Sequence, residues 1–118
     1  MKSSLWLGLA VLLLSGCQTV RPLYYWGNYE NLLYLSYAKP DKAALQVQLE
    51  KLEEDVNKSA ATSSAAHPGL HAQLGYVYFQ LGRVDDAARE FEREKTLFPE
   101  STPFMDRMIA KAKGAPTK

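Results

Sequence analysis

The sequence predicts an all-α protein built from antiparallel helical hairpins, with about five helices after a cleaved N-terminal segment. Three observations support this fold class. The segment 68–101 places small and aromatic residues at spacings that fit two closely packed helices. Apolar residues also recur every three to four positions in two upstream stretches, 24–38 and 45–56, as expected for helices with a buried face.

Residues 1–16 are predicted to be a secretory signal peptide. Lys2 precedes the apolar run Leu5–Leu14, which has the basic start and short apolar core of such a signal. This run is too short for a permanent membrane-spanning helix. An ordinary signal peptide followed by a chance cysteine is the simplest interpretation, and the residues at the cleavage site decide against it.

Those residues are Leu14-Ser15-Gly16-Cys17, and they resemble the bacterial lipobox. The resemblance implies that Cys17 becomes the first residue of the mature protein and carries covalent lipid, with residues 17–23 as a lipidated tether. Lipidation would consume the only cysteine of the chain. Gln18 stands where an aspartate tends to retain such proteins at the inner membrane, so the resemblance implies the outer membrane.

The mature chain is short and carries no net charge. Removal of residues 1–16 leaves 102 of the 118 residues and takes the net charge from +1 to 0, because Lys2 is the only charged residue removed. This length suits one small domain, and the charge argues against a nucleic-acid partner. The basic residues after Asp106 indicate a solvated helix end or a weak contact with anionic headgroups or cell-wall polymer.

Residues 25–58 are predicted to form a degenerate helical hairpin. Its first helix lies in the stretch 24–38, where five of the seven tyrosines gather. Its second helix starts near Pro40, because proline is tolerated in a first helical turn. The acidic residues of 50–55 are expected on its solvated face. The small residues of 59–66 allow either a flexible linker or a weakly helical extension.

The 34-residue segment 68–101 predicts the best defined helix pair. A glycine in the first helix lets the second approach closely, another glycine ends the first helix in a left-handed turn, and a proline ends the second. The expected packing positions are Leu74, Gly75, Tyr78, Gly82, Ala87, Phe91 and Pro99.

The order and spacing of these positions resemble the tetratricopeptide signature, whose period is also 34 residues. An unrelated helix pair of similar length is the alternative. His71 and Glu94 depart from the signature, and we expect both to loosen the packing at the outer helix ends. Residues 102–113 are predicted to form a capping helix that begins at Thr102 and packs through Phe104 and Met108, with Met105 and Ile109 as further candidates. Residues 114–118 are expected to be a disordered tail.

The tetratricopeptide resemblance also implies a partner-binding groove formed by Ala72, Tyr76, Phe79 and Gln80. We expect the ring of Phe79 in the core and the ring of Tyr76 in the groove, because tyrosine can pack its ring and keep its hydroxyl in water. The alternative is that the tyrosine-rich segment 24–38 covers both rings.

No set of residues predicts catalysis. His67 and His71 are four residues apart, but Pro68 lies between them and no cysteine or carboxylate is close in sequence, so we predict no metal site. Ser63 and Ser64 stand beside His67 in a low-complexity stretch that is poorly suited to holding catalytic geometry. We therefore predict a protein that is not an enzyme and has no cofactor besides the lipid on Cys17.

The whole layout resembles a family of short proteobacterial outer-membrane lipoproteins found alongside two other lipoproteins, one of them similar to the curli secretion channel. The resemblance implies a lipid-anchored, periplasm-facing protein that binds an envelope protein such as this channel-like lipoprotein. Regulation of a peptidoglycan synthase is an alternative binding role. A cell-wall enzyme is the opposing class, which predicts turnover by the purified domain.

Overall fold

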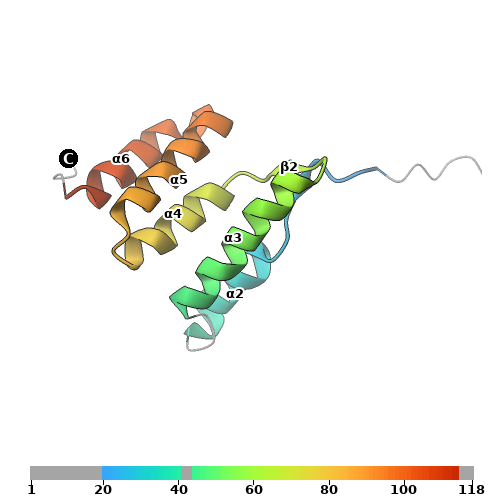
Figure 1. The fold of residues 1–118 in the computed structure, drawn as a ribbon, viewed down its shortest axis with the longest axis horizontal. Coiled ribbons are helices and arrows are strands. Elements are labelled where there is room, and N and C mark those ends of the chain that lie inside the picture. The colour runs from blue at the N-terminus through green and yellow to red at the C-terminus, as the bar shows by residue number, and fades with distance from the viewer. Residues whose placement is uncertain (1–19, 41–43, 115–118) are drawn as a thin grey trace, which may run out of the picture.

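The computed structural model describes residues 20–40 and 44–114. Within this part, five α-helices pack as consecutive pairs (Figure 1). Helices α4, α5 and α6 lie side by side, and the α2–α3 hairpin packs on α4 through α3. The predicted all-α hairpin fold is therefore confirmed. The helices are α2 (Tyr29–Ala38), α3 (Leu45–Ala61), α4 (Leu70–Gln80), α5 (Val84–Leu97) and α6 (Thr102–Ala112), with a 3-10 turn at Pro99–Ser101.

The first hairpin begins with a short strand instead of a helix. Strand β1 (Tyr24–Tyr25) pairs in parallel with strand β2 (Ala65–Ala66). The prediction of a helix in the stretch 24–38 is therefore wrong at its start. Paired aromatic residues favour extended backbone, and Gly27 follows with a left-handed φ of 48°, which separates the strand from α2.

Two further boundaries differ from the prediction. Helix α3 begins at Leu45 and not near Pro40, and residues 41–43 lie outside the described part. The segment 59–66 is neither wholly a linker nor wholly a helix. Helix α3 continues to Ala61, and the chain then bends into β2, whose backbone hydrogen bonds to β1 outweigh the weak helical preference of the remaining small residues.

The core is centred on α4. Leu70, Leu74 and Val77 are almost fully buried there, facing Leu52 of α3 and Phe91 of α5. The two helices of the second hairpin cross very closely. A β-carbon added to Gly75 would lie 2.7 Å from a ring carbon of Phe91 and 3.1 Å from the carbonyl oxygen of Ala87. Glycine at position 75 therefore sets the distance between α4 and α5.

Three other expected packing positions, Tyr78, Gly82 and Pro99, lie at a buried helix contact or at a helix end. Tyr78 is buried, and its pKa is raised to about 12, mainly by burial and then by the hydrogen bond that its hydroxyl donates to Glu53. Gly82 has a left-handed φ of 76°, and the backbone N–H of Arg83 donates to the carbonyl of Tyr78 at 2.9 Å. This is how glycine commonly ends a helix. Pro99 opens the 3-10 turn that follows α5.

Three of the four residues expected on the inner face of α6 pack against the core, and Phe104 does not. Met105 is buried, with Met108 and Ile109 partly buried against the core. Phe104 was expected inside, but its side chain is 55% exposed. The reason is helical geometry: Met105, Met108 and Ile109 share one face through i, i+3 and i+4 spacing, and Phe104, about 100° before Met105, lies outside the centre of that face.

Several predictions lie outside the described residues. These are the signal peptide 1–16, the lipidation site Cys17 with residues 18–19 of its tether, and all of the tail 114–118 except Gly114. Each helix within residues 20–40 and 44–114 is too short or too polar to span a bilayer.

Candidate partner-binding groove

Two buried carboxylates hold the helical framework around the groove. The first, Asp55 of α3, is fully buried. Its carboxylate accepts hydrogen bonds from the backbone N–H of Asn28 at 2.7 Å and from the Asn28 side-chain amide at 2.9 Å. The expectation that residues 50–55 form only a solvated acidic face is therefore wrong at Asp55, which accepts the free backbone N–H of Asn28 at the start of α2.

The second carboxylate, Glu94 of α5, does the same for α4. Its two oxygens accept from the backbone N–H of Gly69 at 2.7 Å and of Ala72 at 3.3 Å. Glu94 is buried, and an anion at a helix N-terminus is favoured by the helix dipole. The expectation that Glu94 loosens the packing is wrong. In both hairpins, a carboxylate of the second helix satisfies the N-terminus of the first.

His71 also makes a specific buried contact, so the expected loosening there is wrong as well. Its Nδ1 lies 2.7 Å from a carboxylate oxygen of Glu90, whose other oxygen accepts from Arg93 at 2.8 Å. His67 has other neighbours, because its ring stacks on Trp26 with centroids 4.3 Å apart. No group of three or more metal-ligating side chains gathers in the described part of the chain.

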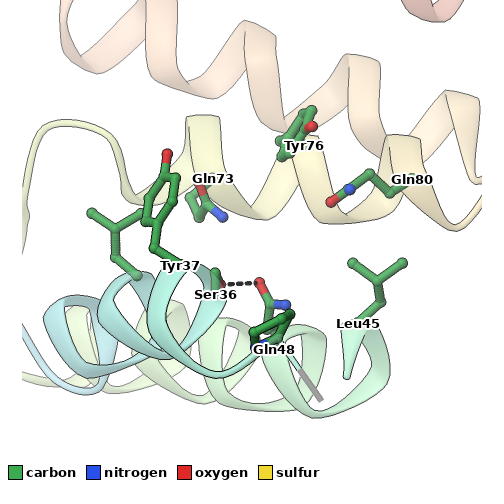
Figure 2. A pocket seen from close by; sticks show the side chains of 9 residues that line it. Ser36, Tyr37, Leu45, Gln48, Gln73, Tyr76 and Gln80 are labelled. Carbon is green, nitrogen blue, oxygen red and sulfur yellow. Dashed lines mark hydrogen bonds between the residues drawn. The ribbon is translucent and has the colours of Figure 1, made fainter. Parts of the chain in front are cut away.

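An open groove lies between α4 and the α2–α3 hairpin (Figure 2). We call it the inter-hairpin groove, and its volume is about 350 Å³. Tyr76 and Gln80 contribute the α4 side of the groove, and Gln48 and Leu45 of α3 lie on the opposite side. Tyr37 rises from α2 beside Gln73 (Figure 2). Its lining residues are Leu33, Ser36, Tyr37, Pro40, Leu45, Gln48, Gln73, Tyr76 and Gln80.

Among residues 20–40 and 44–114, the side chains that line this groove are polar or apolar but uncharged. Three glutamine amides and two phenols stand among the lining residues, none of which is Asp, Glu, Lys, Arg or His. Ser36 Oγ lies 2.8 Å from the carbonyl oxygen of Leu32 and 3.2 Å from Gln48 Oε1, which orders this side of the groove. Amide and hydroxyl groups both donate and accept hydrogen bonds, so the groove suits the backbone and neutral side chains of a peptide.

A second hollow, of about 330 Å³, continues this surface toward α6. Gln73 and Tyr76 line both hollows, so Tyr76 stands at the centre of a continuous surface. Its side chain is 40% exposed. The second hollow is more apolar in its lining, which consists of Tyr29, Gly69, Ala72, Gln73, Tyr76, Phe91, Phe104, Met105, Met108 and Lys111.

The structure therefore brings three of the four predicted groove residues to open surface. Tyr76 and Gln80 line the inter-hairpin groove, and Ala72 lines the second hollow. Phe79 lines neither hollow; it is partly buried against the core, and the Lys111 ammonium lies 5.8 Å from its ring centre. The tyrosine-rich segment contributes Tyr37 to the groove wall and does not cover Tyr76.

Sequence reasoning missed Gln73, although a signal for it existed. Gln73, Tyr76 and Gln80 follow an i, i+3, i+7 spacing that places them on one helical face. The contributions of Tyr37 and Gln48 carry no such signal, because they depend on how the first hairpin packs on α4.

Tyr29 lines the second hollow, and its pKa is raised by burial and then by the nearby Glu94 carboxylate. Its hydroxyl therefore stays protonated and available as a donor.

Fold and site together define a small helical domain of two hairpins and a terminal helix, with a neutral groove between the hairpins. The chain belongs to the family described as a domain of unknown function, DUF4810, whose model matches residues 23–108. This span starts just before β1 and ends within α6. No curated protein and no solved structure matches the chain.

Proposed function

We propose that this protein is a non-enzymatic, lipid-anchored envelope protein that binds a partner protein through the inter-hairpin groove. Its anchor is the lipidated Cys17, and its place is the periplasmic side of the outer membrane. The partner is an envelope protein, and a curli-channel-like lipoprotein is the expected class. The anchor rests on the lipobox resemblance, and the partner class rests on the resemblance in overall layout.

The observation that carries the binding role is Tyr76 at the meeting point of two open hollows. Tyrosine is enriched among the residues that dominate protein–protein binding energy, because its ring packs while its hydroxyl finds a partner. The surrounding amides offer hydrogen bonds without the desolvation cost of charged groups. These features favour a neutral, extended peptide segment of the partner as the bound element.

Truncation of Tyr76 should weaken partner capture without unfolding the domain. Tyr76→Ala removes a ring that is 40% exposed, and loss of such a binding residue costs about 2 kcal/mol or more of binding free energy. We expect at least about a tenfold drop in capture, since 1.4 kcal/mol corresponds to tenfold in affinity. The measurement is affinity capture of the lipidated protein from detergent-solubilised envelopes, paired with a thermal melt of each variant.

Tyr34→Ala is the matched control. Tyr34 lies on α2, is 63% exposed and does not line the groove, so its truncation should leave capture unchanged. Phe79→Ala should lower the melting temperature instead, although by less than for a fully buried ring because Phe79 is only partly buried. Equal capture by Tyr76→Ala and wild type, or unfolding of Tyr76→Ala, would remove the groove from the proposal.

A further inference from the structure

The chain entering the domain displays large apolar side chains to water. We call residues 20–26 the strap. Val20 is 91% exposed, Leu23 is 75% exposed and Trp26 is 44% exposed. Single exposed apolar residues are ordinary on protein surfaces, but here three of seven consecutive residues are of this kind. The strap therefore forms an apolar edge at the N-terminal end of the domain.

The strap is attached to the fold at several points. Tyr24 and Tyr25 pair with β2, and the hydroxyl of Ser64 donates to the carbonyl of Pro22 at 3.3 Å. The indole of Trp26 stacks on the buried ring of His67, with the two planes within 8° of parallel. The exposed part of Trp26 is therefore fixed relative to the domain. A surface that contacts Trp26 also lies against this end of the domain.

Chain length brings this edge close to the proposed anchor. Val20 is three residues after Cys17, and an extended chain covers at most about 3.6 Å per residue. With lipid on Cys17, Val20 lies within roughly 11 Å of the membrane surface, because three extended residues reach no further. The paired strand β1 begins four residues after Val20, so little free chain separates the bilayer from the strap.

The charges along the chain around the strap suit a phospholipid surface, and the nearby Asp55 carboxylate, which contacts Asn28, is fully buried. Arg21 is the only charged residue of the strap, and Glu30 is the first acidic residue after it. The stretch 59–84, which contains the pairing strand β2, has no Asp or Glu at all. Tryptophan and tyrosine are enriched where a protein meets the headgroup region, because one end of the side chain is apolar and the other is polar.

We propose that the strap is a membrane-interface contact, in which Val20, Leu23 and Trp26 insert among phospholipid headgroups next to the lipid anchor. This inference rests on the proposed lipidation of Cys17. It adds that the domain is held end-on against the bilayer by its own side chains. The inter-hairpin groove then has a set orientation to the membrane and does not tumble on a loose tether.

Trp26 reports on this contact directly, because it is the only tryptophan after Trp6 of the signal peptide. The test uses the mature lipidated protein in vesicles of phosphatidylethanolamine and phosphatidylglycerol, some with lipids brominated near the headgroup end of the acyl chains. We expect brominated lipid to quench Trp26 emission and aqueous iodide to quench it weakly. Unquenched emission in brominated vesicles, together with full access to iodide, would overturn the inference.

Two variants distinguish insertion of the strap into the membrane surface from mere proximity of the domain to the membrane. Tyr37→Trp in a Trp26→Phe background places the reporter in the last turn of α2, at a position where Tyr37 is 84% exposed. This reporter should respond to iodide and not to brominated lipid. Val20→Asp combined with Leu23→Asp should abolish lipid quenching of Trp26 while circular dichroism stays helical; quenching that persists would contradict the role of the strap.

The mass of the purified protein distinguishes failure of this inference from failure of the anchor. A lipid mass on Cys17 with Trp26 in water would overturn the strap contact and leave the anchor intact. A mature protein without lipid on Cys17 would overturn both.

Discussion

Replacing Gly75 by leucine should destabilise the domain by about 3 kcal/mol, the upper part of the usual range for overpacking. A β-carbon alone would already meet the Phe91 ring at 2.7 Å and the backbone oxygen of Ala87 at 3.1 Å. The ring is buried and the oxygen belongs to α5, so α4 and α5 must separate to admit a side chain. Chemical denaturation followed by circular dichroism measures the loss.

Ala60→Leu is the matched control, because it adds the same side chain type to an exposed helical position of α3. Its free energy of unfolding should stay within about 0.5 kcal/mol of wild type, as is usual for surface substitutions. Ala87→Leu, at a fully buried position of α5, should behave like Gly75→Leu. A wild-type unfolding midpoint for Gly75→Leu would mean that the close crossing of α4 and α5 is wrong.

Removal of the Asp55 carboxylate should cost a similar amount. Asp55→Ala leaves the backbone N–H and the side-chain amide of Asn28 without their acceptor in a buried place. Loss of hydrogen bonds to a charged group, with donors left unsatisfied, costs about 3 kcal/mol. We expect a lower unfolding midpoint and early loss of protection from hydrogen exchange at the start of α2.

Two comparisons make the Asp55 prediction specific. Glu50→Ala removes an exposed carboxylate from the same helix and should be nearly neutral. Asp55→Asn keeps one oxygen acceptor and should lose less stability than Asp55→Ala. If Glu50→Ala and Asp55→Ala were equally stable, the buried capping role of Asp55 would be wrong.

The sequence predicts the second hairpin well because its packing depends on residue size at fixed spacing. Gly75, Ala87 and Phe91 identify the helix crossing before any coordinates exist, and Gly82 identifies the turn. The first hairpin is predicted only coarsely. Strand β1 pairs with residues about 41 positions away, and no local pattern in Tyr24–Tyr25 distinguishes that strand from the first turn of a helix.

Buried polar residues were the main source of wrong predictions. Asp55, His71 and Glu94 look like surface residues or signature departures in the sequence, because their partners are 19 to 27 positions away. The structure supplies those partners and turns each residue into a specific contact. The same holds for the groove. Residue spacing predicts which side chains share the groove face of α4, whereas the places of Tyr37 and Gln48 depend on the packing between the hairpins.

The central claim is that a partner protein binds at the inter-hairpin groove. Its most direct test is in-cell photocrosslinking with a photoreactive residue in place of Tyr76, Gln80 or Arg89, the last a largely exposed residue of α5 that does not line the groove. Partner binding at the groove should give one shared adduct with a single envelope protein at positions 76 and 80, and none at position 89. Absence of that adduct from positions 76 and 80, or its equal formation at position 89, would contradict the account.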